Sequence, residues 1–239
     1  AGVVIGICLQ SNVSLAISIL LGLLTGVLVG ALNGLAITKI GLPPFIVTLS
    51  LMNITRGMAQ GFTSGSPIKI PDSLKALAIG DFIGIPYTVC YMIVLAVIFS
   101  LILSKTVFGR QVYALGGNED AARLSGLNTT KLKVFVYAIS GFLAAFAGIM
   151  TTARLGVAQS ANGDGYEMDV IASVVIGGTS MTGGKGTIIG SLIGAVIMGV
   201  LRNGLVMLDV NAYWQKVVIG SVIMGAVTMD MLRNKKSGK

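Results

Sequence analysis

The sequence predicts an all-α polytopic membrane protein with about seven to eight transmembrane or partial spans. The first observation is composition: 54% of the 239 residues are hydrophobic and 11% are charged, whereas a soluble domain carries about 25% charged residues. The second is a mean hydropathy of +0.89. The third is a series of apolar runs close to the roughly 20 residues that a spanning helix needs. We therefore expect residues 1–239 to form a single transmembrane domain.

The apolar runs give the expected spans in chain order. Two runs of full spanning length, Val13–Thr38 and Val134–Ala153, contain no charged residue, and two others contain one arginine each, Arg56 and Arg202. The chain begins without Met and inside an apolar run, so we expect an N-terminal part to be missing. The expected spans are Ala1–Leu9, Val13–Thr38, Pro44–Thr63, Val89–Ser104, Val134–Ala153, Thr187–Leu208 and Val217–Leu232, with Asp169–Gly178 as a partial or broken span.

The basic residues predict the orientation of the spans. If Val13–Thr38 runs inward and the spans then alternate, eleven Lys and Arg residues fall inside and four outside. Cytoplasmic loops of membrane proteins carry such an excess. We therefore place the loop 105–133 and the C-terminus in the cytoplasm and the loop 64–86 outside. The net charge of +8 then reflects this loop bias, and we expect no nucleic-acid partner.

Glycines recur every four residues on two of the expected spans. One set lies on Val13–Thr38 and the other at the start of Thr187–Leu208. Faces of small residues at this spacing let helix backbones approach closely in lipid. The sequence favours packing within the chain and leaves contact between copies open. The two sets are Gly22, Gly26, Gly30 and Gly34, and Gly186, Gly190 and Gly194.

Polar residues inside the spans are candidates for a solute pathway. Asn53, Arg56 and Gln60 are three and seven residues apart and so share one helix face. A charged group in the membrane should face the protein interior or water, either to hold its neighbours or to line a pathway. For Arg202, we expect Asp209, seven residues on, to neutralise its charge.

Acidic and aromatic residues cluster where the chain returns to the membrane from outside, at Asp164, Tyr166, Glu167 and Asp169. The chain has no histidine, and no nucleophile or metal-ligand set accompanies these carboxylates, so we expect no enzyme activity and no metal. Tyr166 and Asp169 suit contact with a polar solute such as a sugar. The alternative is helix capping and anchoring at the membrane interface.

The stretch GGTSMTGGKGT, residues 177–187, resembles a phosphate-binding loop but lacks its fixed positions. The loop requires Gly-x-x-x-x-Gly-Lys-Ser/Thr, and the sequence has Thr179 and Gly186 at two of those points. We therefore expect this chain to bind no ATP. The interpretation is an inner turn with a glycine hinge, at Gly177, Gly178, Gly183, Gly184 and Gly186. Thr179 and Ser180 are candidate pathway residues, because interrupted helices expose polar backbone where transporters bind solute.

The outer loop 64–86 contains a further short helix signal. Asp72 or Ser73 is a suitable N-cap, and Leu74, Leu77 and Ala78 give an apolar side. One interpretation is a helix lying at the membrane interface. The other is a docking surface for an extracytoplasmic partner.

The inner loop predicts a short cytoplasmic helix at about 118–125. Asn118 is a good N-cap, Glu119 and Asp120 suit the positive helix start, Arg123 lies four residues after Glu119, and Gly126 is a natural stop. Small apolar residues on this helix are available to insert into a cleft on a cytoplasmic partner. The candidate docking residues are Asn118, Glu119, Asp120, Ala121, Ala122, Arg123, Leu124, Ser125 and Gly126.

Three stretches carry a resemblance to a known family: LPPFIVTLSLMNITRGMAQGFTSGSPI, GRQVYALGGNEDAARLSGLNTTKLK and GYEMDVIASVVIGGTSMTGGKGTIIGSLIGAVIMGVLRNGL. Together they resemble the membrane permease of bacterial ribose-type ABC sugar importers. The resemblance implies an inner-membrane subunit for a ribose-like pentose or a hexose, without catalytic activity of its own. It also implies that about one quarter of a typical permease is absent upstream of Ala1.

The resemblance also implies the partners. They are a second permease copy, cytoplasmic ABC ATPase subunits that hold ATP and Mg²⁺, and a periplasmic sugar-binding protein. Residues 118–126 would be the coupling helix that docks on the ATPase. Two alternatives stay open: a branched-chain amino acid ABC permease of the same architecture, and a stand-alone secondary carrier or channel.

Overall fold

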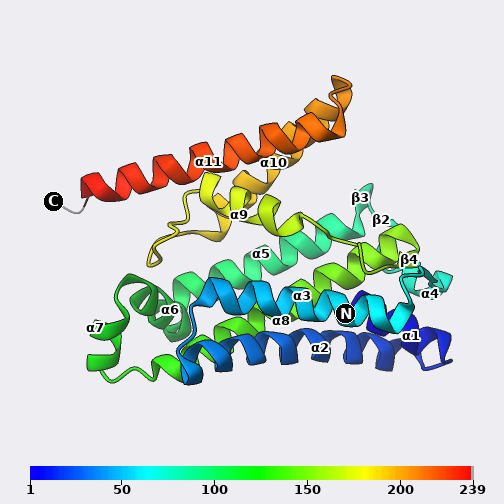
Figure 1. Cartoon of the computed structure of the whole chain (residues 1–239), viewed down its shortest axis with the longest axis horizontal. Helices are drawn as coiled ribbons and strands as arrows, with labels where there is room; N and C mark the ends of the chain where they lie inside the picture. The colour runs from blue at the N-terminus through cyan, green and yellow to red at the C-terminus, as the bar shows by residue number, and fades with distance from the viewer. Residues whose placement is uncertain (238–239) are drawn as a thin grey trace. The chain divides into compact units, whose positions relative to one another are not determined.

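The computed structural model describes residues 1–237 and is almost wholly helical (Figure 1). It divides into two compact units: unit 1 is Ala1–Met92 with Asn128–Gly163, and unit 2 is Ile93–Leu127 with Asp164–Lys239. In chain order the elements are α1 (Gly2–Gln10), α2 (Leu15–Leu35), the π-helix η1 (Ala36–Ile40), α3 (Pro44–Thr63), β1 (Ile68–Lys69), α4 (Asp72–Lys75), β2 (Asp81–Phe82), β3 (Ile85–Pro86), α5 (Tyr87–Lys105), α6 (Val107–Gly117), α7 (Glu119–Leu124), α8 (Thr129–Leu155), β4 (Val157–Ala158), α9 (Tyr166–Ile176), α10 (Ile188–Met207) and α11 (Ala212–Ser237).

The helices confirm the predicted all-α membrane class. Among the described residues, four segments are long and apolar enough to cross a membrane: Leu15–Ile40, Tyr87–Lys105, Thr129–Leu155 and Ile188–Met207. The helices α3 and α11 have 20 and 26 residues, which is enough length, but a more polar sequence. The helices α1 and α9 have 9 and 11 residues. At about 1.5 Å per residue they are too short to cross a core about 30 Å thick, so the count of seven to eight spans stays a prediction.

In unit 1, α2 and α8 lie side by side along the glycine face of α2 (Figure 1). A methyl group on Gly26 would overlap the carbonyl oxygen of Gly141, and one on Gly30 would overlap that of Tyr137. The opposite face of α2 carries leucines such as Leu28, which is 61% exposed. Packing within the chain therefore explains this set of glycines, as the sequence favoured, and the leucine face is left for lipid.

The α-helical winding changes at the C-terminal end of α2. The five residues that follow α2 form the π-helix η1, which Gly41 ends with a φ of +77°. Thr38 donates a hydrogen bond from its hydroxyl to the carbonyl oxygen of Gly34 over 2.7 Å. Turns of this type occur mostly as single interruptions in longer helices. The expected span Val13–Thr38 therefore continues to Ile40 in an altered winding.

The other end of unit 1 is closed by the loop 64–86, which packs onto α1 and α8. The strand β1 pairs antiparallel with β4, so that Ile68 lies opposite Ala158. On the short helix α4, Leu74 is fully buried in a core with Ile5 and Ile149. The apolar side of this helix therefore packs within unit 1, and its position at the membrane interface stays a prediction.

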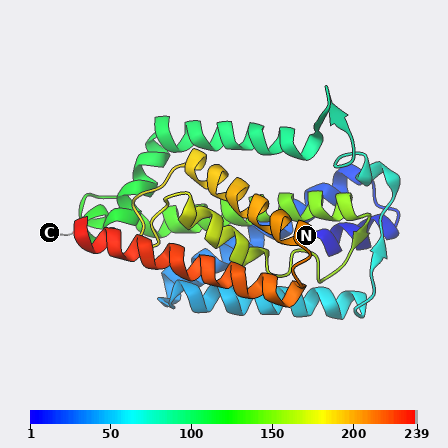
Figure 2. The same cartoon turned by 90° about the horizontal axis from the view of Figure 1, so that it is seen from above.

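In unit 2, α9 is held between α10 and α11 (Figure 2). Ala172, Met198 and Ile219 form the buried core of this group, with one residue from each helix. The glycine face of α10 meets α9 directly, because a methyl group on Gly194 would overlap the carbonyl oxygen of Ser173. The second predicted set of glycines therefore also serves packing within the chain.

Candidate functional site

The helix α9 ends in a Schellman motif at Gly178, the last residue of the predicted partial span Asp169–Gly178. Gly178 has a φ of +85°, which residues with a side chain rarely adopt. Its N–H donates to the carbonyl oxygen of Val175 over 2.9 Å, and the N–H of Thr179 donates to that of Val174 over 3.1 Å. These bonds satisfy carbonyls that the helix end would leave unpaired. Glycine chemistry therefore accounts for the broken span.

The following turn, residues 177–187, closes on itself around Ser180. The N–H of Ser180 donates to the carbonyl oxygen of Lys185 over 3.0 Å, and the N–H of Gly183 donates to that of Ser180 over 3.1 Å. The Ser180 hydroxyl lies 2.9 Å from the Thr182 hydroxyl. Because Ser180 is buried and bonded within the turn, it helps to build the turn, and its role as a solute contact stays a prediction.

Four of the five predicted hinge glycines are sites of close packing, and Gly178 meets nothing within 4 Å. A methyl group on Gly177 would overlap the carbonyl oxygen of Gly190, and one on Gly186 would lie 2.7 Å from the side chain of Thr179. Gly183 and Gly184 adopt φ angles of +89° and +74°. The turn is therefore tightly packed and joins the ends of α9 and α10, and its movement as a hinge stays a prediction.

The turn 177–187 also packs on α6, in the predicted cytoplasmic loop (Figure 2). The Tyr113 hydroxyl donates a hydrogen bond to the carbonyl oxygen of Gly186 over 2.7 Å. Added methyl groups on Gly116 and Gly183 would each meet the backbone of the other segment. Sequence analysis missed Tyr113. The signal available was the pair Gly116–Gly117 three residues after an aromatic residue in a basic loop. The contact agrees with the predicted placement of the loop 105–133 and the turn 177–187 on the same side of the membrane.

The short helix predicted at about 118–125 is present as α7, and its role as a coupling helix stays a prediction. Asn118 caps it, because its side-chain Oδ1 accepts a hydrogen bond from the N–H of Ala121 over 3.0 Å. Gly126, with a φ of +85°, ends it in a second Schellman motif. Arg123 forms an ion pair with Asp120, three residues before it, at 3.3 Å. Of the residues expected to be available to a partner, Leu124 is 89% exposed, whereas Ala122 is buried within the chain.

An ion pair joins α9 to α10. Arg202 Nη2 lies 2.9 Å from Asp169 Oδ2, and the two side chains are 48% and 22% exposed. The expectation that Asp209 neutralises Arg202 is wrong, because α10 ends at Met207 and Asp209 lies beyond it at a φ of +52°. Asp169, proposed from the sequence as a solute contact, therefore already has a charged partner.

The remaining pathway candidates are divided between the units. Asn53 and Arg56 lie on α3 in unit 1, whereas Tyr166, Asp169 and Thr179 belong to unit 2. Tyr166 is half exposed at the start of α9, and Asn53 is exposed on α3. The structure therefore places two of the candidates in unit 1 and four in unit 2, where Tyr166 and Asp169 lie in the first turn of α9 and Thr179 and Ser180 lie beyond its other end. Among residues 1–237, no three His, Cys, Asp or Glu side chains group closely enough to hold a metal ion.

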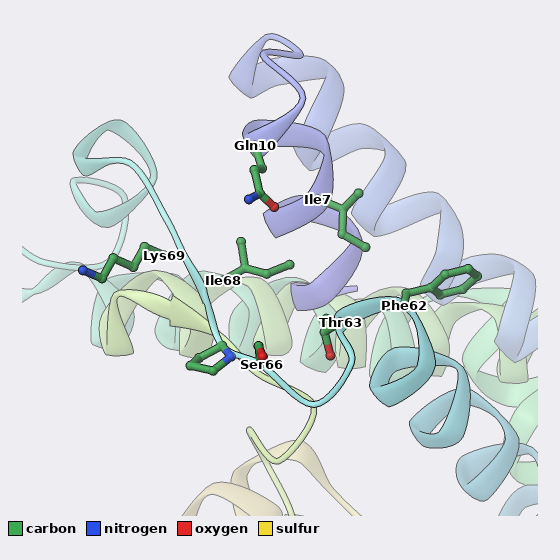
Figure 3. A pocket seen from close by; sticks show the side chains of 8 residues that line it. Ile7, Gln10, Phe62, Thr63, Ser66, Ile68 and Lys69 are labelled. Carbon is green, nitrogen blue, oxygen red and sulfur yellow. The ribbon is translucent and has the colours of Figure 1, made fainter.

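Unit 1 contains a pocket of about 680 Å³ that the sequence did not indicate (Figure 3). Its walls come from α1, the end of α3 and the first part of the loop 64–86, which includes β1 and is predicted to be extracytoplasmic. In the same loop, Lys75 donates a hydrogen bond to Asp72 over 2.7 Å. This hydrogen bond, together with the charge of Lys75, holds the pKa of the Asp72 carboxyl below its usual value. The residues that line the pocket are Ile7, Gln10, Phe62, Thr63, Ser66, Pro67, Ile68 and Lys69.

Comparison with known proteins identifies the family. The sequence model of a family described as "Branched-chain amino acid transport system / permease component" matches residues 1–227. The chain belongs to this permease family. No solved structure matches the permease.

Individual relatives of the permease carry sugar names. It is 46% identical over 201 residues to the ribose import permease protein RbsC of Bacillus subtilis, covering 83% of the permease and 62% of that relative. It is 45% identical over 209 residues to RbsC of Escherichia coli, covering 85% and 64%. It is 38% identical over 236 residues to the L-arabinose transport system permease protein AraH of Escherichia coli, covering 98% and 72%. The permease thus spans 62–64% of the length of these two ribose permeases.

Proposed function

We propose that this chain is the transmembrane permease subunit of an ATP-binding-cassette importer for a monosaccharide, a ribose-like pentose or a hexose. The observation that carries the proposal is the identity of 45–46% to two ribose import permeases over 83–85% of the chain. The subunit performs no chemistry of its own. ATP and Mg²⁺ belong to cytoplasmic ATPase subunits, and the sugar is delivered by a periplasmic binding protein.

The sugar is favoured over a branched-chain amino acid. The family description names branched-chain amino acids. The relatives with 45–46% and 38% identity are named for ribose and L-arabinose. The identity of 38–46% to these sugar permeases, over most of the chain, supports a pentose as the substrate.

The proposed coupling site is α7 with its caps, residues 118–126, in the loop 105–133. Three features support it: the Asn118 cap, the Gly126 stop and the exposed Leu124 side chain. A short capped helix keeps its shape without a partner, so it loses little conformational freedom when it docks. Closure of the ATPases on ATP would push α7 and change the access of the pathway from one side of the membrane to the other.

The proposed assembly is a homodimer of permeases in the bacterial inner membrane, with the C-terminus in the cytoplasm. The basic loop and tail support this orientation. The tail ends in residues 238–239, which lie outside the described residues. The proposed pathway residues are Asn53, Arg56, Tyr166, Asp169, Thr179 and Ser180, and the proposed hinge is the glycine turn 177–187.

Uptake assays test the proposal. The permease would be co-expressed with a candidate ABC ATPase and a candidate sugar-binding protein, and given radiolabelled ribose, arabinose, glucose or leucine. We expect pentose or hexose uptake that stops when the ATPase is inactivated. Leucine uptake alone would favour the amino acid permease. Sugar uptake that persists without the ATPase would identify a secondary carrier and overturn the proposal.

A further inference from the structure

The helices α6 and α7 are joined at a single residue, Asn118, which ends one and begins the other. Its N–H donates to the carbonyl oxygen of Ala114 over 3.1 Å, and its carbonyl oxygen accepts from the N–H of Ala122 over 3.0 Å. Its side chain caps α7 through Ala121. Because Asn118 forms backbone hydrogen bonds to both helices, the junction of α6 and α7 has little conformational freedom. A displacement of α7 therefore carries the last turn of α6 with it.

That last turn of α6 touches the glycine turn 177–187 backbone to backbone. A methyl group on Gly116 would lie 2.7 Å from the Gly184 nitrogen, and one on Gly184 would lie 2.8 Å from Gly117 Cα. The Tyr113 hydroxyl, one helical turn earlier, donates to the Gly186 carbonyl over 2.7 Å. Close-packed backbone transmits displacement, because it has no flexible side chain that could absorb it.

The turn itself cannot shift without moving the helices on either side. Ser180 closes it through hydrogen bonds to Lys185 and Gly183. The Thr179 side chain rests against Gly186, the residue that Tyr113 holds. Gly177 is in backbone contact with Gly190 of α10. A displacement of Gly186 would therefore also displace the end of α9, the start of α10 and Thr179.

We propose that Tyr113 and the contact of Gly116–Gly117 with Gly183–Gly184 transmit movement of α7 to the α9–α10 turn. Tyr113 is then a positioning residue that acts on Thr179 through Gly186. The proposal rests on the coupling role proposed for α7. It adds the route by which ATP-driven movement enters the membrane part of the permease.

The test uses the full transporter in proteoliposomes with its binding protein and radiolabelled ribose, and measures ribose moved per ATP hydrolysed. Tyr113→Phe removes only the hydroxyl. We expect ATPase co-purification to stay normal and the ratio to fall roughly two- to tenfold, the range of one lost neutral hydrogen bond. The control is Tyr91→Phe, which keeps the edge-on ring contact of Tyr91 with Phe146.

A second pair of variants tests the backbone contact. Gly116→Ala places a methyl group against Gly184, whereas Gly148→Ala on α8 meets nothing within 4 Å. Both glycines lie within helices, so both variants gain helix propensity. We expect Gly116→Ala to lower the ribose-to-ATP ratio and Gly148→Ala to leave it unchanged.

A local readout follows the turn itself. In a background without Cys8 and Cys90, Lys185→Cys reports the turn through its rate of thiol labelling. We expect a non-hydrolysable ATP analogue to change this rate in the otherwise unaltered permease and not with Tyr113→Phe.

Three results would overturn the proposal. One is ribose-to-ATP ratios for Tyr113→Phe and Gly116→Ala that equal those of their controls. Another is loss of ATPase binding by Tyr113→Phe, which would place its effect on docking. The third is an unaltered transporter that neither hydrolyses ATP in response to the loaded binding protein nor moves ribose. That last result alone would also remove the proposed function.

Discussion

Arg202 on α10 places its guanidinium Nη2 2.9 Å from the carboxylate Oδ2 of Asp169 on α9. The pair holds the short helix α9, which has only 11 residues, to a neighbour of spanning length. Neutralising one residue of the pair leaves the charge of the other without its ion-pair partner. We expect Asp169→Asn and Arg202→Gln each to destabilise the protein by about 1 kcal/mol in detergent, where solvent screens the half-exposed arginine. Thermal unfolding measures the loss.

A charge reversal separates the pair from other effects of the two residues. We expect the double variant Asp169→Arg with Arg202→Asp to recover part of the stability that each reversal loses alone. The double-mutant cycle then gives a coupling energy. A coupling energy near zero would show that the two charges stabilise the fold independently.

The glycine seam between α2 and α8 should not tolerate a side chain. Gly30→Leu forces a branched side chain against the Tyr137 carbonyl, and overpacking of this kind costs about 1–3 kcal/mol. The expected result is a lower Tm and a smaller monodisperse fraction in size-exclusion chromatography. The matched control is Gly57→Leu on α3, where an added Cβ meets nothing within 4 Å. Equal losses for both variants would contradict the seam.

The glycine spacing shows which part of the helix packing could be predicted from the sequence. A repeat of four predicted that one face of α2 would pack closely, and it does. The sequence did not indicate α8 as the partner. In a membrane protein, residues that face lipid and residues that face another helix are both apolar, so hydropathy does not predict which helices pack together. The helix stops were more predictable, because Gly126 and Gly178 carry their own backbone preference.

The polar contacts were the least predictable part of the candidate site. Spacing along one helix suggested Asp209 as the partner of Arg202, but the actual partner lies on another helix. The hydrogen bond from Tyr113 to Gly186 joins residues 73 positions apart. Contacts of this kind depend on the packing of helices, which a local pattern does not contain.

The exposed side chain of Leu124 predicts a surface variant that acts on docking alone. Leu124 is 89% exposed on α7, so Leu124→Ala should change the free energy of unfolding by less than about 0.5 kcal/mol. Because α7 is the proposed docking helix, we expect ATPase co-purification to fall several-fold. The control is Leu28→Ala on α2, an exposed leucine outside the loop 105–133. Normal ATPase retention by the Leu124 variant would count against docking through this side chain.

Variants at Thr179 and Ser180 should distinguish a role in solute contact from a role in forming the turn. Ser180 is buried and bonded within the turn, so Ser180→Ala should lower stability. Thr179→Val keeps the shape that packs against Gly186 and removes the hydroxyl. If that hydroxyl contacts the sugar, the KM of ribose uptake should rise roughly two- to tenfold, because one hydrogen bond is lost, while ribose moved per ATP stays constant. Thr151→Val on α8, where the hydroxyl bonds only its own helix at Ala147, is the control. An unchanged KM would leave Thr179 with a packing role alone, since its methyl group already fills the space beside Gly186.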